Sequence, residues 1–138
     1  MAGLSVDPHG STTLVPEKDF EALKQRLTGL TGDDRCLRVA RWFFADRTTR
    51  TISPFQSETV PEYVQRRIAE DTLSSLEEAV RLDPTNGLAL ARLAKLLLPS
   101  DPARETRRTA EAISLAKRAL RFAPGLDEAR HVIERAAR

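Results

Sequence analysis

The sequence is poor in the side chains that carry out enzymatic chemistry. Its 138 residues include one cysteine and two histidines. It contains no HExxH, GxSxG, P-loop or glycine-rich dinucleotide pattern, so the spacing that a metal site, a nucleophile or a phosphate-binding loop needs is missing. Carboxylates such as Glu77 and Glu78 fall on expected helix surfaces, close to Arg81. The sequence therefore predicts a protein that is not an enzyme and that holds no cofactor and no metal.

A single cysteine also excludes an internal disulfide. Cys36 stands among apolar residues, which favours a buried thiol in a reducing compartment. No apolar run approaches the roughly 20 residues of a membrane span, and the first residues lack the basic and apolar regions of a signal peptide. We therefore expect a cytoplasmic protein that does not contact a membrane.

Neither sign of charge is in large excess. The chain has 22 Lys and Arg against 20 Asp and Glu, a formal net charge of +2. This total implies neither a nucleic-acid coat nor an acidic tail. The length fits one domain, which would bury roughly two thirds of the unfolded surface.

The first half of the chain predicts a loose start followed by two helices. Residues 1–13 are rich in Gly, Ser, Thr and Pro without a period, so we expect a disordered tail. Residues 14–60 predict a helical hairpin and then an extended loop. The second helix of the hairpin, residues 35 to about 47, is apolar over so much of its circumference that it should lie centrally. Its expected inward residues are Cys36, Val39, Ala40 and Phe43.

Two short segments of this half resemble known patterns. The segment from Arg50 to Pro54 resembles a basophilic or proline-directed phosphorylation site with Ser53 as the acceptor, a pattern that often arises by chance. The strings ARWFFADR at residues 40–47 and ISPF at residues 52–55 are similar to the tails of large bacterial kinase or β-propeller proteins.

Residues 72–98 predict two antiparallel helices joined by a tight corner, because apolar residues recur at helical spacing on both sides of it. Pro84 cannot continue a helix and disfavours helical geometry at Asp83, whereas Asn86 can cap the helix that follows. Asp71 is the expected cap of the helix before the corner. Other helices are expected at residues 61–70, about 103–122 and 126–137. The expected fold class is all-α, with about seven helices.

The corner recurs later in the chain. The segment from Arg81 to Ala91 aligns with the segment from Arg121 to His131, which places Pro84 and Pro124 at a separation of 124 − 84 = 40 positions. A fixed period of this kind indicates stacked helical repeats.

Residues 61–138 resemble the tetratricopeptide repeat, a helix-turn-helix unit of about 34 residues. The resemblance rests on positions that match the helices and the turn proline of that family: Leu90, Leu93, Ala94, Leu97, Ala112, Ala119 and Pro124, with Tyr63, Thr72, Leu76, Ala79 and Pro84 one repeat earlier. Ala116 departs from the pattern by being small, and the period is about six residues longer than usual. The resemblance implies antiparallel hairpins stacked as a short right-handed solenoid, ending in a capping helix. We expect this solenoid to form one compact domain with the N-terminal hairpin.

The resemblance further implies a concave groove lined by the first helix of each pair. The matching positions place four basic side chains along it: Arg92, Lys95, His131 and Arg135. Together they could receive an acidic peptide or a C-terminal carboxylate. A solvated charged face explains the same residues. The asparagines with which the family clamps a carboxylate are absent.

The sequence therefore favours a protein-interaction scaffold or regulatory module, with two alternatives open. One is an RNA-binding or phosphate-binding face on the helix expected at residues 103–122. Its basic residues are Arg104, Arg107, Arg108, Lys117, Arg118 and Arg121. No aromatic side chain is interleaved for base stacking, and Glu105 and Glu111 offer ion-pair partners, which makes nucleic acid the less favoured partner. The other alternative is a spacer or oligomerisation segment of a larger protein, and the sequence does not set the oligomeric state.

Overall fold

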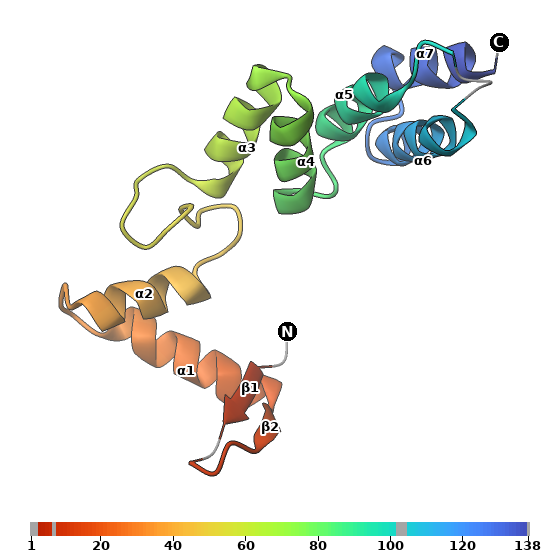
Figure 1. Ribbon diagram of the computed structural model, residues 1–138. Coiled ribbons are helices and arrows are strands. Elements are labelled where there is room, and N and C mark those ends of the chain that lie inside the picture. The colour runs from red at the N-terminus through yellow and green to blue at the C-terminus, as the bar shows by residue number, and fades with distance from the viewer. Residues whose placement is uncertain (1–2, 7, 102–104, 138) are drawn as a thin grey trace. The chain divides into compact units, whose positions relative to one another are not determined.

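The computed structural model describes residues 3–6, 8–101 and 105–137, and the chain divides into two compact units, residues 1–59 and 60–138. That these units form one compact domain stays a prediction. The described residues form seven α-helices and one two-stranded sheet (Figure 1). The all-α prediction thus holds for everything except this sheet.

The first unit begins with an antiparallel hairpin where the sequence predicts a disordered tail. Strand β1 (Gly3–Val6) pairs with strand β2 (Thr12–Val15). Gly10 lies in the connection at φ 83°, a conformation that glycine adopts without steric cost. Pro8 and Gly10, two of the residues that favour a tail, lie in this connection, whereas the β-branched Thr and Val residues beside them favour strands.

Two helices follow in the first unit, α1 (Glu17–Gly29) and α2 (Arg35–Phe44), close to the predicted spans. Asp34 caps α2 by accepting two backbone N–H groups of its first turn. Phe20 of α1 packs against Phe44 of α2 with ring centroids 5.0 Å apart. This ring contact joins the two helices as the predicted hairpin.

Helix α2 is not the central, covered helix that its apolar residues predict. None of the residues described between 8 and 59 is buried. Val39 and Phe43 are 40% and 59% exposed, and Cys36 is exposed as well, so the prediction of a buried thiol is wrong. An apolar stripe indicates that one face of a helix packs against another element. It does not indicate whether that element belongs to the same unit.

The loop after α2, residues 45–59, is closed by its own hydrogen bonds. Thr51 and Thr59 form an isolated antiparallel bridge, and Trp42 Nε1 donates a hydrogen bond of 2.6 Å to the carbonyl oxygen of Thr51. Phe55 is 52% exposed and lies beneath the guanidinium groups of two α2 arginines. The loop is therefore attached to α2 by polar and cation–π contacts.

The described residues of the second unit are entirely helical. Its helices are α3 (Val60–Glu70), α4 (Leu73–Leu82), α5 (Gly87–Leu97), α6 (Thr106–Phe122) and α7 (Asp127–Ala136). Consecutive helices pack on one another, and α7 also contacts α5. The predicted spans agree to within a few residues, although the predicted start of α6 at residue 103 lies outside the described residues. Thr72, not Asp71, caps α4, through a reciprocal pair of hydrogen bonds with Ser75.

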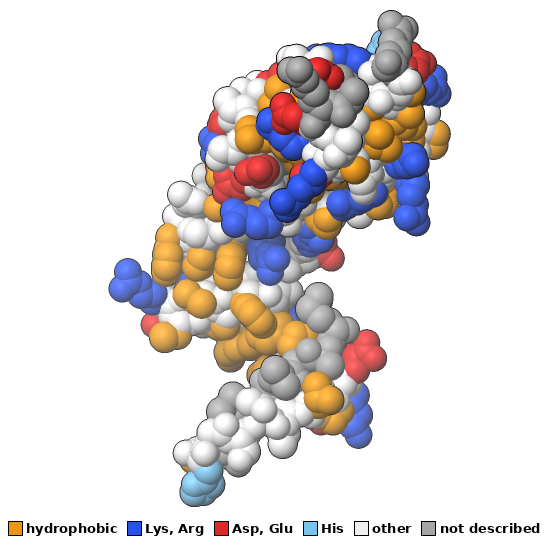
Figure 2. Space-filling model, turned by 45° about the vertical axis from the view of Figure 1, so that its right-hand side comes forward, with side chains coloured by type: hydrophobic (Ala, Val, Ile, Leu, Met, Phe, Trp, Pro, Cys, Tyr) orange, Lys and Arg blue, Asp and Glu red, His pale blue; other side chains and the backbone are white. Residues whose placement is uncertain are grey.

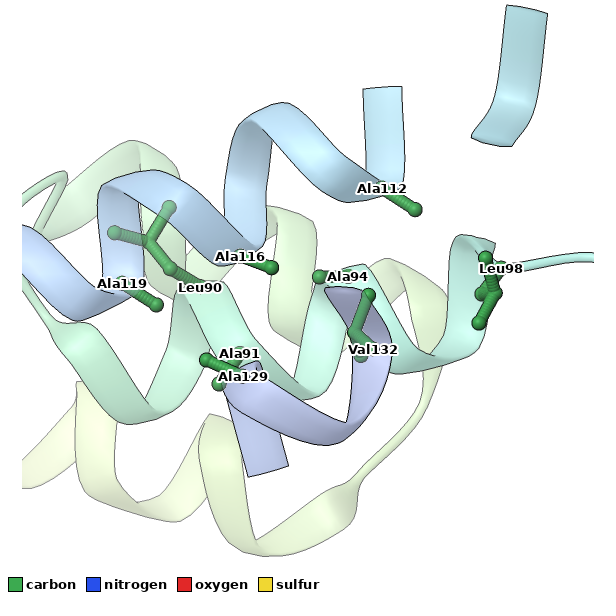
Figure 3. Close-up of a cluster of buried hydrophobic side chains, with 9 residues drawn as sticks. All are labelled: Leu90, Ala91, Ala94, Leu98, Ala112, Ala116, Ala119, Ala129 and Val132. Atoms are coloured by element: carbon green, nitrogen blue, oxygen red, sulfur yellow. The ribbon is translucent and has the colours of Figure 1, made fainter. Parts of the chain in front are cut away.

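Helix α5 is shared by two apolar cores. The first core joins it to α3 and α4 and consists of Val64, Ile68, Leu76, Ala79, Ala89 and Leu93. The second joins it to α6 and α7 and consists of Leu90, Ala91, Ala94, Leu98, Ala112, Ala116, Ala119, Ala129 and Val132 (Figure 3). The many alanines let the helix backbones approach closely. As a result, both sides of α5 are covered within residues 60–138.

The two proline corners have the same backbone conformation. Asp83 and Ala123, which end the helices before them, have φ/ψ values of −132°/84° and −139°/82°. Asn86 and Leu126, which precede the next helices, have values of −72°/102° and −84°/102°. In each corner the second of these residues donates its N–H to the carbonyl oxygen of the first, at 3.1 and 3.2 Å. The corners differ in one respect, since Asn86 caps α5 with its side chain and Leu126 does not cap α7.

Candidate partner-binding surface

Arg92, the first of the predicted groove residues, is held by contacts within its own unit. Its guanidinium donates a hydrogen bond of 3.1 Å to the carbonyl oxygen of Ile68, near the C-terminal end of α3. The same group lies 3.9 Å from Asp71 Oδ1 and 3.8 Å from Glu128 Oε2. A cation is favoured at the C-terminal end of a helix, where carbonyl groups lack partners. We call this set of contacts the Arg92 tie, because it joins α3, α5 and α7.

Glu128 depends on Arg92 for a counter-charge. Its Oε2 atom is buried, although the side chain as a whole is 38% exposed, and no hydrogen-bond partner for that atom is present in the described residues. Arg92 therefore supplies the nearby positive charge that compensates it. A buried charge that loses its partner destabilises a protein more than an exposed ion pair stabilises it. Arg92 thus has a structural role.

Helices α5 and α7 run past each other in the same direction. In the core that they share, Ala129 lies beside Ala91, and Val132, one turn further along α7, lies on the side of Ala94, one turn further along α5. The two helices are therefore parallel over these residues.

The other three predicted groove residues are exposed on these two helices. Lys95 follows Arg92 by one turn on α5, and His131 and Arg135 follow Glu128 by one and two turns on α7. Side chains at these spacings share a helix face. None of the three makes an ion pair or a side-chain hydrogen bond with the rest of the described chain. We call Lys95, His131 and Arg135 the α5–α7 basic surface.

The second predicted basic group lies on the outer side of α6. Its described members are all exposed: Arg107, Arg108, Lys117, Arg118 and Arg121. Arg108 pairs with Glu105 at 3.2 Å, and Arg118 donates a hydrogen bond of 3.4 Å to the carbonyl oxygen of Pro84. Arg104 lies outside the described residues. On the face shown in Figure 2, basic side chains are interspersed with acidic ones and form no continuous basic stripe.

A polar cluster between α3 and α4 is missing from the sequence predictions. Tyr63 Oη donates a hydrogen bond of 2.9 Å to Glu78 Oε1. Arg67 contacts Glu78 Oε2 at 2.7 Å and Glu70 Oε2 at 2.5 Å. The hydrogen bond to Glu78, followed by burial and by the negative charge of Glu78, raises the pKa of Tyr63. Within this cluster, only the Arg67–Glu70 pair could be predicted from the sequence, because its residues are three positions apart on one helix.

Ser53, the candidate phosphorylation acceptor, is half-buried in the loop after α2. Its Oγ accepts a hydrogen bond of 3.3 Å from the N–H of Phe55. Thr51 Oγ1 donates one of 2.7 Å to its carbonyl oxygen. The hydroxyl group of Ser53 is therefore part of the turn that shapes this loop.

The described residues lack both a metal-binding group and a membrane-spanning helix. Among them, no three His, Cys, Asp or Glu residues are grouped so that they could hold a metal ion. Within the same part of the chain, every helix is too short or too polar to cross a membrane.

No protein-family model, no curated protein and no solved structure matches the chain. The tetratricopeptide resemblance of residues 61–138 therefore stays a prediction.

Proposed function

We propose that the chain is a non-enzymatic protein-interaction module of the tetratricopeptide type, acting in the cytoplasm as a scaffold or regulatory segment. The α5–α7 basic surface binds an acidic peptide segment. The Arg92 tie carries this proposal, because it holds α5 beside α7 and so presents Lys95, His131 and Arg135 together. The shared conformation of the two proline corners supports the repeat assignment.

The chemistry of this surface suits a carboxylate-rich ligand. Lys95 and Arg135 are exposed cations that donate charge-assisted hydrogen bonds to carboxylates. Leu96, which is 42% exposed next to Lys95, offers an apolar contact. Each exposed ion pair contributes at most about 1 kcal/mol, so we expect weak binding that added salt weakens further.

A charge-reversal experiment tests the site. The probe is a short, fluorescein-labelled, glutamate-rich peptide that contains one leucine, and fluorescence polarisation measures its binding. The double variant Lys95→Glu/Arg135→Glu should weaken binding by about tenfold or more, which corresponds to about 1.4 kcal/mol. Arg92 is left intact, because its reversal would break the tie and confuse loss of binding with loss of structure.

The matched control is Lys117→Glu/Arg121→Glu on α6. It replaces one exposed lysine and one exposed arginine and changes the net charge by the same amount. We expect it to bind the peptide as the wild type does. Equal weakening by both double variants would mean that the peptide responds only to total charge, and the proposed site would be rejected.

The α6 basic face supports a second candidate function, binding of nucleic acid or phosphate. Arg107, Lys117 and Arg121 are exposed on it, and such residues neutralise phosphates in a salt-dependent way. With a single-stranded RNA oligonucleotide as the probe, this function predicts that Lys117→Glu/Arg121→Glu weakens binding and Lys95→Glu/Arg135→Glu does not. The same two variants therefore separate the two candidates.

A further inference from the structure

We infer that the α5–α7 basic surface holds a phosphoryl group, so that the acidic peptide bound there carries a phosphorylated serine or threonine. This inference rests on the proposed function and specifies the acidic group that the surface recognises. Lys95 and Arg135 hold the phosphoryl group, with His131 beside them. The positions of these side chains on α5 and α7, and the lack of a matching negative charge near them, carry the inference.

The three residues lie at nearly the same level along the two helices. Ala129 of α7 lies beside Ala91 of α5, and the helices run in the same direction. Counted from this level, Lys95 is four residues further along α5, whereas His131 and Arg135 are two and six residues further along α7. At about 1.5 Å per residue, Lys95 is therefore within about 3 Å of the level of each of the other two.

Lys95 lies on the side of α5 that turns towards α7. It follows Ala91 by four residues and precedes Leu98 by three, so it shares a side of the helix with both. Ala91 and Leu98 are buried in the core that α5 forms with α6 and α7, and Ala91 lies beside Ala129 of α7. The exposed side chain of Lys95 therefore begins at the edge of the contact between α5 and α7.

Arg135 lies on the side of α7 that turns towards α5. It follows Val132 by three residues and Glu128 by seven, so it shares a side of the helix with both. Val132 belongs to the shared core, and Glu128 Oε2 lies 3.8 Å from Nε of Arg92 on α5. The axes of packed helices are about 8–10 Å apart, a distance that the long side chains of Lys95 and Arg135 span from both sides. Their charged ends can therefore meet at one group.

The acidic residues described on α5 and α7 leave these cations unmatched. All three acidic residues are on α7. Glu128 is compensated by Arg92, and Asp127 forms an ion pair of 3.2 Å within α7. Glu134 is two residues after Val132, about 200° round the helix from it, so it points away from α5. A bound anion would therefore meet the positive charge without competition from these carboxylates.

A phosphoryl group fits this arrangement better than a carboxylate does. Phosphoserine carries a charge of about −1.5 to −2 at pH 7 and has three strong acceptor oxygens, whereas an ionised carboxylate has a single charge on two oxygens. Lys95 and Arg135 supply two positive charges, and the imidazole of His131 adds an N–H donor. One phosphoryl group can therefore accept hydrogen bonds from all three side chains at once.

Three fluorescein-labelled peptides test the inference by fluorescence polarisation with the full chain. They share one neutral sequence with a single leucine, and they contain either one serine, one phosphoserine in its place, or two glutamates three residues apart. The two-glutamate peptide matches the charge of the phosphoserine peptide but divides it between two side chains. We expect the phosphoserine peptide to bind about threefold or more tightly than the two-glutamate peptide, and the serine peptide to bind least.

Neutralising variants assign this preference to the surface. Lys95→Gln/Arg135→Gln should remove the preference for phosphoserine, because both cations that meet at the phosphoryl group are lost. The matched control, Lys117→Gln/Arg121→Gln on α6, removes the same charge at exposed positions and should keep the preference. Circular dichroism shows whether both variants keep their helix content.

Three results would overturn the inference. One is a phosphoserine peptide that binds no more tightly than the two-glutamate peptide, and another is a preference that survives Lys95→Gln/Arg135→Gln. The third is displacement of the labelled phosphoserine peptide by inorganic phosphate at the concentration at which the unlabelled peptide displaces it, since the surface would then recognise phosphate and not a peptide. The first result leaves the proposed function intact if the glutamate-rich peptide still depends on Lys95 and Arg135, so the two proposals can be told apart.

Discussion

Gly87 marks a close approach between the start of α5 and the end of α6. A Cβ atom at this position would lie 2.8 Å from Cβ of Ala123 and 3.2 Å from the carbonyl oxygen of Ala119. Because that oxygen belongs to a helix backbone, it cannot turn aside. Gly87→Ala should therefore lower the free energy of unfolding by about 1–3 kcal/mol, despite the higher helix propensity of alanine. Urea denaturation followed by circular dichroism measures the change.

Gly125, in the second proline corner, provides the control. A Cβ atom there would have nothing within 4 Å. Gly125→Ala should leave the free energy of unfolding unchanged or raise it by about 0.4–1 kcal/mol, because alanine restricts the unfolded chain. Equal destabilisation by the two substitutions would mean that the helices do not approach closely at Gly87.

Tyr63 gives a prediction for pH. It is the one tyrosine of the chain, so its ionisation can be followed by absorbance without interference from another phenol. The hydrogen bond to Glu78, burial and the charge of Glu78 raise its pKa above the ordinary value of 10.0. The folded state thus favours the neutral phenol. Its stabilising effect is complete below the ordinary pKa and is lost as the pH rises through the pKa of the folded protein.

Absorbance titration of two neighbouring variants checks this cause. Glu78→Gln should lower the pKa of Tyr63 towards its ordinary value, because the negative charge and the strong acceptor are both removed. Glu77→Gln removes an exposed charge one position away and should leave the pKa close to that of the wild type. If Glu78→Gln left it unchanged as well, the hydrogen bond between the two side chains would be refuted.

The sequence predicts side-chain roles that act locally and misses those that act across helices. The sequence predicts Asn86 as a cap, and its side chain does accept a hydrogen bond of 3.1 Å from the N–H of Ala89 within its own turn. The repeat pattern predicts Arg92 as a groove residue, yet its guanidinium donates a hydrogen bond to Ile68, 24 positions away. No periodic pattern indicates a partner at that distance.

The Arg92 tie adds a polar link between α3, α5 and α7 to the apolar cores that already pack these helices. Arg92→Met keeps most of the side-chain volume but removes the hydrogen bond to Ile68 and leaves Glu128 Oε2 without its counter-charge. With allowance for a side chain that is 30% exposed, we expect a loss of about 1–2 kcal/mol in the free energy of unfolding. Lys95→Met, one turn along the same helix at an exposed position, should change it by no more than about 0.5 kcal/mol.

A second substitution identifies the source of that loss. If the uncompensated carboxylate of Glu128 dominates, Glu128→Gln should restore part of the stability of Arg92→Met, because a neutral amide needs no counter-charge. Thermal unfolding of the two single variants and the double variant measures this coupling. Additive effects in the three proteins would show that Arg92 does not compensate Glu128.

The helices themselves could be predicted from the sequence because their signals are local. Caps, prolines and apolar spacing placed α4 and α5 to within a residue or two. The apolar stripe of α2 predicts a core face, but the same spacing occurs whether the element that covers it lies in the same unit, lies elsewhere or is absent. The strands β1 and β2 were missed because each has only four residues and the connection between them is rich in turn-forming residues.

The two units differ in how far their apolar side chains are buried. Both sides of α5 pack against other helices within residues 60–138, so that unit forms both apolar cores by itself. The length of the chain suggested one domain. Length does not show how the apolar residues are shared between the two halves, which is why the division could not be predicted.

This division predicts that the two units behave differently when separated. A fragment of residues 60–138 should keep a cooperative thermal transition with a midpoint close to that of the same unit in the full chain, because both cores lie inside it. A fragment of residues 1–59 has no buried residue among those described from residue 8 onward, so it should melt broadly when dilute. Circular dichroism follows both fragments.

The helix content of the 60–138 fragment should not change with protein concentration, because both apolar cores are closed within it. A cooperative transition in the dilute 1–59 fragment, or its loss from 60–138, would contradict the assignment of the cores, because stability would then lie in the unit with the exposed apolar face.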